Sequence, residues 1–399
     1  MRAVALRLGL LPLRVPAVLV GGTNGKGSTA TTLATLLHAA GLRTGLFTSP
    51  HLIDYNERIR VDGRPADDAA LCAAFERIEA ASGTTSLSFF EYNALAALEL
   101  CARAGVQSMV LEVGLGGRLD ATNIVDADVA VLCSIGLDHT EWLGATLELI
   151  GAEKAGIFRA GGRVVLATDE LPHTVFDALA ELQCRVRLAG RDFDWQLQDD
   201  GQWSWRCDGH APLGPLPPPR LWGAVQYRNA AAALAAWQAL HEAQPERVPA
   251  PTLAAATRGL QSVTLPGRLQ VLERGAEWVL DVAHNVPAAQ VLVEALRTRA
   301  PARRTCVIFG MLGDKDVAGV TAVLEPLVDE WWLCGIDAPR GLTAAALGER
   351  MGTTRAPRRA FADVPAACAQ ALRTLQAGER VLVCGSFHIV GPALQSLGV

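Results

Sequence analysis

Short apolar runs alternate with stretches of helical periodicity along most of the chain. Residues 108–113, 127–135 and 163–167 are runs of Val, Leu, Ala and Met broken by few polar residues. Runs of this length and composition predict strands that are buried on both faces of a sheet. Apolar residues three and four positions apart predict helices at 67–81 and 92–104. This alternation predicts an α/β fold with a doubly wound, mostly parallel sheet, which binds ligands at the carboxyl ends of its strands.

The alternation stops near residue 190 and begins again in the last third of the chain. Tryptophan-containing runs flank Asp199-Asp200-Gly201, which predicts a β-hairpin insertion near 192–207. Further strands are predicted at 278–282, 305–309, 331–335 and 380–384. They indicate a smaller, Rossmann-like α/β domain. We therefore expect a first domain at 1–262, a linker or hinge at 263–268 that contains Leu265-Pro266-Gly267-Arg268, and a second domain at 269–399.

A glycine-rich turn follows the first apolar run. The run Val18-Leu19-Val20 leads into Gly21-Gly22-Thr23-Asn24-Gly25-Lys26-Gly27-Ser28-Thr29, and a helix is predicted at 30–40. Backbone N–H groups at a helix N-terminus favour a phosphate, and Lys26 can neutralise its charge. Ser28 or Thr29 can reach a phosphate oxygen or its Mg²⁺. The pattern departs from the standard phosphate loop because Gly27 separates the lysine from the hydroxyl, so an ordinary strand–helix turn is the alternative.

Composition excludes several classes of partner. The chain of 399 residues has a formal net charge of −5, which argues against binding to nucleic acid. Its nine cysteines include no C-x-x-C pair, as expected of reduced thiols in a cytoplasmic protein. The first residues of the chain are largely apolar, but Arg7 and Arg14 interrupt them, so we do not interpret this segment as a signal peptide. No apolar stretch is long enough to span a membrane.

Polar residues follow the predicted strands of the first domain. Ser49 follows a predicted strand at 43–47, Glu112 lies inside one, and Asp138 and His139 follow another. A carboxylate in so apolar a strand is costly unless it is paired or binds a metal. Glu112 could equally form a salt bridge with Arg118 or a hydrogen bond to the backbone. Beside a phosphate loop, a hydroxyl, a carboxylate and an imidazole would suit Mg²⁺.

Polar residues also follow two strands of the second domain. Asp281 ends one strand and precedes His284 and Asn285, and Ser386 follows the last strand. These positions suit ligand contact at the edge of a sheet. Asn285 and Ser386 could instead cap the helices that follow them, and capping does not exclude ligand contact.

Taken together, the motifs resemble the bifunctional folylpolyglutamate synthase/dihydrofolate synthase family. These enzymes are ATP-dependent ligases related to the muramoyl-peptide ligases. The resemblance covers nearly the whole chain. The matching stretches are Gly22–Ser28, Thr48–Leu52, Phe89–Tyr92, Leu111–Asn123, Asp138–Gly144, Glu153–Phe158, Leu265–Arg268, Asp281–Asn285 and Cys384–His388.

The resemblance implies roles for individual residues. It implies ATP contacts by Thr23, Asn24, Gly25, Lys26, Gly27, Ser28, Asn229, Arg268 and Asp281. It implies Mg²⁺ ligation by Ser49, Glu112, His139 and Lys154. It implies substrate contacts by Ser88, Phe89, Leu119, His284 and Ser386, with Lys154, His284 and Lys26 as the catalytic set.

Lys154 matches a lysine that the family carbamylates with CO₂. A carbamate supplies the oxygen atoms that Mg²⁺ prefers, whereas an ammonium would be repelled by the metal. The alternative is a surface helix residue that pairs with Glu148 or Glu153.

The resemblance also implies a reaction. A carboxylate of dihydropteroate or a folate attacks the γ-phosphoryl of ATP, and L-glutamate then displaces phosphate from the acyl phosphate. The second domain would bind glutamate and close on ATP. We expect a cytoplasmic monomer with small-molecule substrates. The alternatives are a folylpolyglutamate synthase alone, a muramoyl-peptide-type ligase, or a nucleotide-binding paralogue without catalysis.

One departure concerns the amino terminus. In the family a longer segment precedes the phosphate loop and lines part of the dihydropteroate pocket, and Met1 falls near the end of that segment. We therefore expect the natural start to lie upstream.

Overall fold

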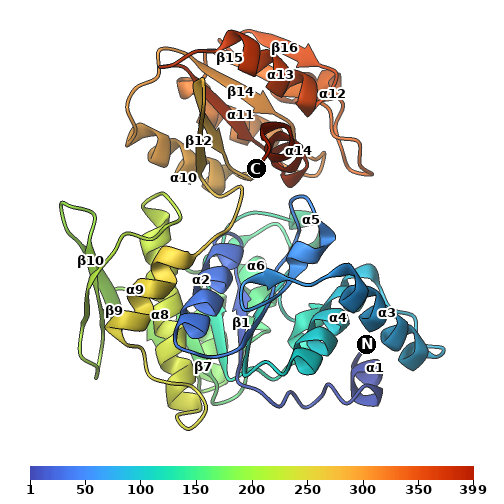
Figure 1. The fold of residues 1–399 in the computed structure, drawn as a ribbon, viewed down its shortest axis with the longest axis vertical. Coiled ribbons are helices and arrows are strands. Elements are labelled where there is room, and N and C mark those ends of the chain that lie inside the picture. Colours follow the sequence, from blue (N-terminus) through green and yellow to red (C-terminus); the bar gives the residue numbers. More distant parts are fainter. The chain divides into compact units, whose positions relative to one another are not determined.

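The computed structural model describes residues 1–399, which form two compact units. Unit 1 comprises Met1–Arg220 and Val225–Thr264, and unit 2 comprises Leu221–Ala224 and Leu265–Val399. Both units have an α/β architecture, as the alternation of strands and helices predicts (Figure 1). None of the helices combines the length and hydropathy that crossing a membrane requires.

Unit 1 is built on an eight-stranded sheet in the order β4-β3-β2-β5-β1-β6-β7-β8. Six neighbouring strands from β2 to β8 are parallel, and β3 and β4 add an antiparallel edge. The strands are β1 Ala17–Gly21, β2 Thr44–Phe47, β3 Ile59–Val61, β4 Arg64–Pro65, β5 Ser108–Glu112, β6 Val129–Leu132, β7 Arg163–Leu166 and β8 Arg185–Leu188.

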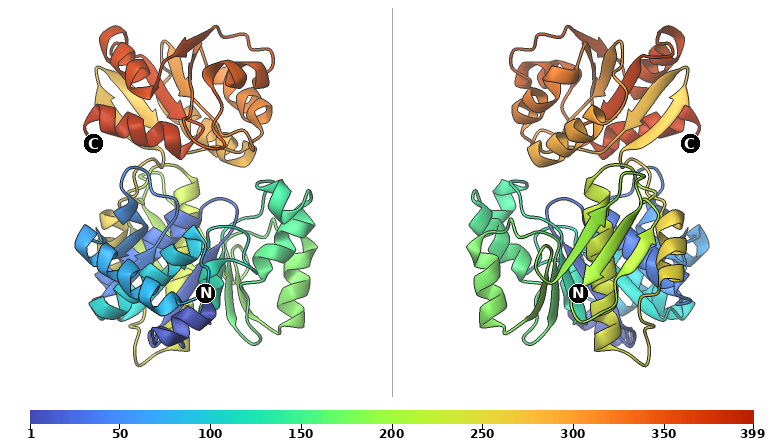
Figure 2. Two further views of the ribbon diagram at one scale, coloured as in Figure 1. Left: turned by 90° about the vertical axis from the view of Figure 1, so that its right-hand side faces the viewer. Right: turned by 90° about the vertical axis from the view of Figure 1, so that its left-hand side faces the viewer.

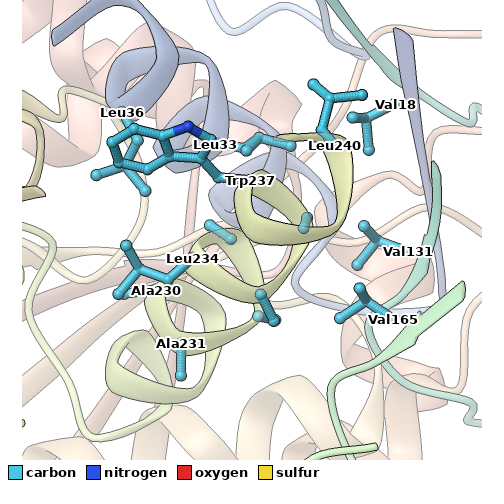
Figure 3. Close-up of a cluster of buried hydrophobic side chains, with 14 of the residues drawn as sticks. Val18, Leu33, Leu36, Val131, Val165, Ala230, Ala231, Leu234, Trp237 and Leu240 are labelled. Carbon is cyan, nitrogen blue, oxygen red and sulfur yellow. The ribbon is translucent and has the colours of Figure 1, made fainter. Parts of the chain in front are cut away.

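Helices cover both faces of this sheet. Val18 and Val20 of β1 pack into a cluster with α2, α8 and α9, whereas Leu19 between them packs into a second cluster with α3 and α4. Figure 3 shows Trp237 of α8 beside the α2 residue Leu33 in the first cluster. Burial on both faces explains why the strands are apolar without alternation. The helices are α1 Arg2–Arg7, α2 Lys26–Ala39, α3 Asp68–Ser82, α4 Phe89–Ala104, α5 Thr140–Leu143, α6 Leu147–Ala155, α7 His173–Glu181, α8 Val225–Ala243 and α9 Leu253–Ser262, with 3₁₀ turns η1 Tyr55–Arg58 and η2 Ala121–Ile124.

A separate three-stranded sheet, β11-β10-β9, packs beside α8 (Figure 2). Strands β9 Phe193–Leu197 and β10 Trp203–Cys207 form the hairpin that the sequence predicts, and β11 Leu213–Leu216 extends it. Trp203 and Trp205 are fully buried, and the indole N–H of Trp203 donates to the carbonyl of Pro217 at 2.8 Å. The hairpin thus contributes its tryptophans to the core of unit 1.

Unit 2 contains a six-stranded sheet in the order β12-β13-β17-β14-β15-β16. All strands are parallel except β12 at the edge. Helices α10 and α11 share one apolar cluster with the sheet, and α13 and α14 pack against each other and against its strands. The elements are β12 Gln270–Arg274, β13 Ala276–Leu280, α10 Val286–Arg297, β14 Thr305–Phe309, α11 Val317–Leu324, η3 Glu325–Leu327, β15 Glu330–Cys334, α12 Ala344–Arg350, β16 Arg358–Phe361, α13 Val364–Thr374, β17 Arg380–Cys384 and α14 Phe387–Leu397.

The main differences from the sequence prediction lie at helix starts and sheet edges. Helix α2 begins at Lys26, four residues before the predicted start. The glycine turn ends at Gly25, so the residues from Lys26 onward, which the sequence analysis placed in the turn, belong to the helix. Edge strands such as β16, with two arginines in four residues, carry no apolar run that pattern could detect.

Candidate active site

The first set of predicted residues meets at one edge of the unit 1 sheet. Strands β2, β5, β1 and β6 are neighbours, and Val20 of β1 pairs with Glu112, the last residue of β5. The glycine turn follows β1, and Ser49 follows β2. The parallel strands therefore bring the phosphate loop, the hydroxyl and the carboxylate to a common carboxyl edge.

The glycine turn is held against the segment that follows β6. Thr23 N–H donates to the Ser134 carbonyl at 2.8 Å, and Asn24 N–H donates to Ser134 Oγ at 3.0 Å. Gly22 has a φ of +141°, and a Cβ there would lie only 3.1 Å from Ser134 N. Glycine at this position is required for the turn to approach the β6 segment so closely.

The start of α2 has the features that an anion site requires. Gly25 occupies the cap position, and no side chain caps the helix. The first backbone N–H groups of the helix are thus available to an anion, and the helix dipole favours negative charge there. Lys26 Nζ donates to the Thr23 carbonyl at 3.0 Å, which keeps its charge beside the turn. Buried Ser28 lies in the first helical turn.

A buried acceptor lies against the same turn. Asn229 on α8 is 2% exposed, and its Oδ1 has no hydrogen-bond partner, although its Nδ2 donates to Gln226 Oε1 at 3.0 Å. A Cβ at Gly25 would lie 3.0 Å from Asn229 Oδ1. An unpaired buried acceptor is costly in a completed structure, so this atom fits contact with a ligand donor such as a nucleotide amine.

Glu112 is 3% exposed and accepts a hydrogen bond from Ser49 N–H at 3.0 Å through Oε2. The alternative of a backbone hydrogen bond is therefore confirmed. The alternative of a salt bridge to Arg118 is wrong, because Arg118 pairs with Glu153 at 2.8 Å. The hydrogen bond from Ser49 to Glu112 therefore joins two of the predicted metal ligands.

Lys154 lies near the end of α6 and is 5% exposed. Its Nζ donates to the Gly22 carbonyl at 2.9 Å, so the interpretation as a surface residue is wrong. Burial, with a contribution from the charge of Lys26, lowers its pKa to about 7. The turn at Gly117 packs directly on α6, since a Cβ there would lie 2.7 Å from the Lys154 carbonyl oxygen. That close packing helps to aim Lys154 at the glycine turn.

His139 begins the short helix α5 and has a left-handed backbone conformation, with a φ of 51°. Its N–H donates to Asp138 Oδ1 at 2.9 Å. No three His, Cys, Asp or Glu side chains lie close enough together to hold a metal ion. A Mg²⁺ site here would therefore depend on Ser49, Glu112, His139 and a modified Lys154, together with water. Such a mixed, oxygen-rich set suits Mg²⁺.

The residues predicted at the pterin-substrate site differ in their environments. Ser88 caps α4 by accepting from Glu91 N–H at 3.3 Å, and Phe89 and Leu119 are 65% and 79% exposed. Sequence reasoning did not single out Trp142, which is 75% exposed. A signal was present, because Trp142 is a large apolar residue that directly follows four polar residues in the matching stretch Asp138–Gly144. Other exposed apolar side chains in the same part of the chain are Leu115, Leu137, Leu147 and Leu149.

Unit 2 places a second set at the carboxyl ends of β13 and β17. Asp281 accepts from Leu269 N–H and from Ala283 N–H, both at 2.8 Å. Burial raises the pKa of this carboxyl, and the charge of Arg268 opposes the increase. The Arg268 guanidinium stacks 5.2 Å from the ring centroid of Phe387. Arg268 and Asp281 are thus neighbours within unit 2.

His284 joins this set through the same aromatic ring. Its ring lies 6.4 Å from that of Phe387, and its Nδ1 contacts the Val282 carbonyl at 2.8 Å. Because a carbonyl can only accept, Nδ1 carries the proton in this contact and Nε2 of the neutral ring is an acceptor.

The expected capping contacts are also present. Asn285 caps α10 through Ala288 N–H at 3.0 Å, and Ser386 caps α14 through His388 N–H at 3.2 Å. The capping alternatives are confirmed, and the ligand roles of these residues stay predictions.

Comparison with known proteins accounts for both units. Residues 20–202 match the Mur ligase middle domain, and residues 267–387 match the Mur ligase glutamate ligase domain. The dihydrofolate synthase/folylpolyglutamate synthase of Escherichia coli is 42% identical over 392 residues, which are 98% of this chain and 89% of the relative. The Haemophilus influenzae enzyme of the same name is 38% identical, over 98% of this chain and 90% of its own.

Solved structures agree with these matches. E. coli FolC in complex with DHPP and ADP has a TM-score of 0.91 and 41% identity, covering 100% of this chain and 92% of that one. A bifunctional folylpolyglutamate synthase/dihydrofolate synthase with Mn, AMPPNP and L-glutamate bound has a TM-score of 0.90 and 42% identity, covering 100% and 93%. The chain therefore belongs to the bifunctional dihydrofolate synthase/folylpolyglutamate synthase family of Mur ligases.

Proposed function

We propose that this chain uses ATP to join L-glutamate to dihydropteroate and to the γ-carboxyl of folates. The observation that carries the proposal is the carboxyl edge of the unit 1 sheet. There, the uncapped start of α2, Glu112 and buried Lys154 lie around one glycine turn. Relatives with this fold bind ADP, DHPP, AMPPNP, Mn and L-glutamate, as their names state.

ATP fits the turn in both charge and shape. In our proposal, backbone N–H groups from Thr23 to Ser28 and the Lys26 ammonium hold the phosphates. Asn229, whose Oδ1 is buried without a partner, contributes a nucleotide contact. Arg268 and Asp281 of unit 2 contribute the remaining ones.

The metal site is proposed to comprise Ser49, Glu112, His139 and Lys154. The low pKa of Lys154, about 7, keeps much of the amine neutral and nucleophilic. The amine attacks the carbon of CO₂, a C–N bond forms, and one nitrogen proton passes to solvent, leaving a carbamate. When bound, Mg²⁺ supplies positive charge for the phosphoryl oxygens.

The residues of the chain then position two displacements. A carboxylate oxygen of the acceptor attacks the γ-phosphorus, ADP leaves, and Lys26 and Arg268 neutralise the transferred group. The amine of glutamate next attacks the acyl carbonyl, and phosphate leaves. We assign acceptance of the amine proton to Nε2 of His284, because its Nδ1 is committed to the Val282 carbonyl. Ser386 is proposed to contact glutamate, and Ser88, Phe89 and Leu119 to contact the pterin substrate.

The same proposal assigns roles to the two parts of the chain. Residues 1–262 bind ATP and the pterin substrate, residues 263–268 form the hinge, and residues 269–399 bind glutamate. We place the enzyme in the cytoplasm, and its nine free cysteines support that assignment.

The test is a phosphate-release assay on the purified full chain with ATP, Mg²⁺ and L-glutamate. Separate reactions contain dihydropteroate, tetrahydrofolate or a UDP-muramoyl acceptor. We expect release with the first two acceptors, and mass spectrometry should find one added glutamate. Phosphate release with tetrahydrofolate alone would restrict the activity to polyglutamylation. If none of the three acceptors gave phosphate release, the result would contradict catalysis by this chain.

A further inference from the structure

Two consecutive charged residues, Glu57 and Arg58, accept hydrogen bonds from the backbone of the loop that follows β2. The carboxylate of Glu57 accepts backbone N–H groups from Leu52, Ile53 and Asp54 at 2.9, 2.9 and 2.8 Å. The carbonyl of the next residue, Arg58, accepts Thr48 N–H at 2.9 Å. Both ends of the loop are therefore tied down around His51, a residue of the matching motifs to which the proposed function assigns no role.

The side chain of Arg58 reaches that histidine. Arg58 is only 7% exposed, and its guanidinium lies 5.6 Å from the ring centroids of both Tyr55 and Phe89. A cation held against two aromatic faces has little freedom to reorient. Its Nε donates to His51 Nδ1 at 2.8 Å.

This contact determines which nitrogen of His51 carries the proton. Arginine has only donors, so Nδ1 of His51 must accept and cannot carry a proton. The ring proton then lies on Nε2, which makes Nε2 the donor of the ring.

The location of the loop connects this donor with the active site. His51 lies two residues after Ser49, whose N–H donates to Glu112 at 3.0 Å. Glu112 also acts electrostatically on Arg58. Arg58, His51 and the predicted metal ligands thus lie at the same carboxyl edge of the sheet, where the acceptor carboxylate must meet ATP.

We propose that Arg58 is a positioning residue that holds His51 as an Nε2–H donor to the carboxylate of the acceptor substrate. The proposal rests on the proposed function for the identity of that substrate. An N–H donor suits a carboxylate that must be oriented toward the γ-phosphorus, because a hydrogen bond to one oxygen leaves the other oxygen free to attack.

The first test reads the tautomer directly. The full chain is labelled with ¹⁵N-histidine, and long-range ¹H–¹⁵N correlation spectra are recorded, with the His51 signals identified by their loss in His51→Gln. We expect wild-type His51 to be protonated on Nε2 only, and Arg58→Met to produce a mixture of tautomers. A proton on Nδ1 in the wild type would overturn the proposal, even if the variant failed to fold. So would an unchanged tautomer in Arg58→Met.

The second test separates positioning from general damage. Arg58→Met should raise the KM for dihydropteroate about 10- to 100-fold and leave the KM for ATP within about twofold. Arg60→Met is the matched control, because Arg60 Nε donates to the Glu57 carbonyl at 3.2 Å and not to His51. Equal increases in both KM values, or none, would contradict the proposal.

A third variant tests whether Arg58 acts through His51. His51→Ala removes the donor itself, so the KM for dihydropteroate should rise as in Arg58→Met, and adding Arg58→Met to it should change that KM little. Additive losses in the double variant would contradict action through His51. Absence of phosphate release in the wild type would instead reject the proposed function, and the tautomer spectra would still decide the Arg58–His51 contact.

Discussion

The carboxyl edges of the two sheets hold polar residues in different ways. In unit 1, Glu112 and Lys154 are 3% and 5% exposed, and each forms a hydrogen bond with the backbone of another segment, at Ser49 and Gly22 respectively. In unit 2, Asn285 and Ser386 cap the helices that follow them, and Asp281 bridges two nearby backbone N–H groups. Buried ionisable groups are enriched at functional sites, so their burial here supports the proposed site at the first edge. At the second edge, the residues that are predicted to bind ligands also stabilise the fold through these caps and backbone hydrogen bonds.

The difference predicts how each edge responds to substitution. Loss of a buried ionisable side chain in unit 1 should reduce activity far more than stability, because burying such a group is itself costly. Loss of a cap in unit 2 should reduce stability, whatever its effect on activity.

The largest effect is expected for Lys154→Met. Removing the amine abolishes the proposed carbamate, so ligation should fall about 100- to 1,000-fold while nucleotide binding is retained. Phosphate release at saturating ATP and calorimetric titration with ADP measure the two properties. Glu153→Gln is the control, since its side chain pairs with Arg118 instead. An unchanged turnover would remove Lys154 from the metal site.

The same variant should change how stability depends on pH. The pKa of Lys154 is about 7 in the folded chain and 10.5 ordinarily, so the unfolded chain binds more protons between these values. The free energy of unfolding of the wild type should therefore rise relative to Lys154→Met by up to about 1.4 kcal/mol per pH unit between pH 7 and 9. Urea unfolding without CO₂, nucleotide or metal measures it, and parallel curves would contradict the desolvated state of the amine.

Arg268→Ala tests whether the second edge also contributes to phosphate binding. A charge-assisted hydrogen bond to phosphate contributes about 1.5–3 kcal/mol, so formation of the acyl phosphate should slow by about 10- to 100-fold. Exposed Arg274→Ala is the matched control. Rapid-quench measurement of the first turnover detects the difference, and an unaltered rate would mean that Arg268 does not contact phosphate.

The smallest effect is expected for Asn285→Ala. Loss of the cap on α10 should lower the free energy of unfolding by about 1 kcal/mol. Asn285→Ser keeps a capping oxygen and serves as the control. If both variants were as stable as the wild type in urea, the cap would contribute nothing to stability. The contrast drawn between the polar residues of the two sheet edges would then be wrong for Asn285.

Sequence reasoning predicted the fold well because both sheets contain strands that are buried on two faces. Strands such as β14 and β17 match their predicted bounds, since apolar runs end where the sheet ends. Edge strands were not predicted because they are exposed to solvent and lack an apolar run, and the start of α2 was not predicted because Gly27 interrupts its helical pattern. Hydrophobic periodicity carries no information about such segments.

The candidate site was predicted less completely. The motif suggested Glu112 and Lys154 as ligands, but only the structure revealed that Lys154 is buried against Gly22 and that Glu112 accepts from Ser49. Arg58 carried no motif signal, since its contact with His51 depends on how the chain returns along β3. Tertiary contacts of this kind cannot be derived from local pattern.

The central claim is that one glycine turn, one buried carboxylate and one buried amine form a nucleotide and metal site. A crystal structure of the full chain with AMPPNP, Mg²⁺ and bicarbonate tests it most directly. We predict phosphates on the turn from Gly22 to Ser28, and a metal ligated by Glu112 and a carbamylated Lys154. An empty turn, with Glu112 and His139 directed away from the nucleotide, would contradict the account.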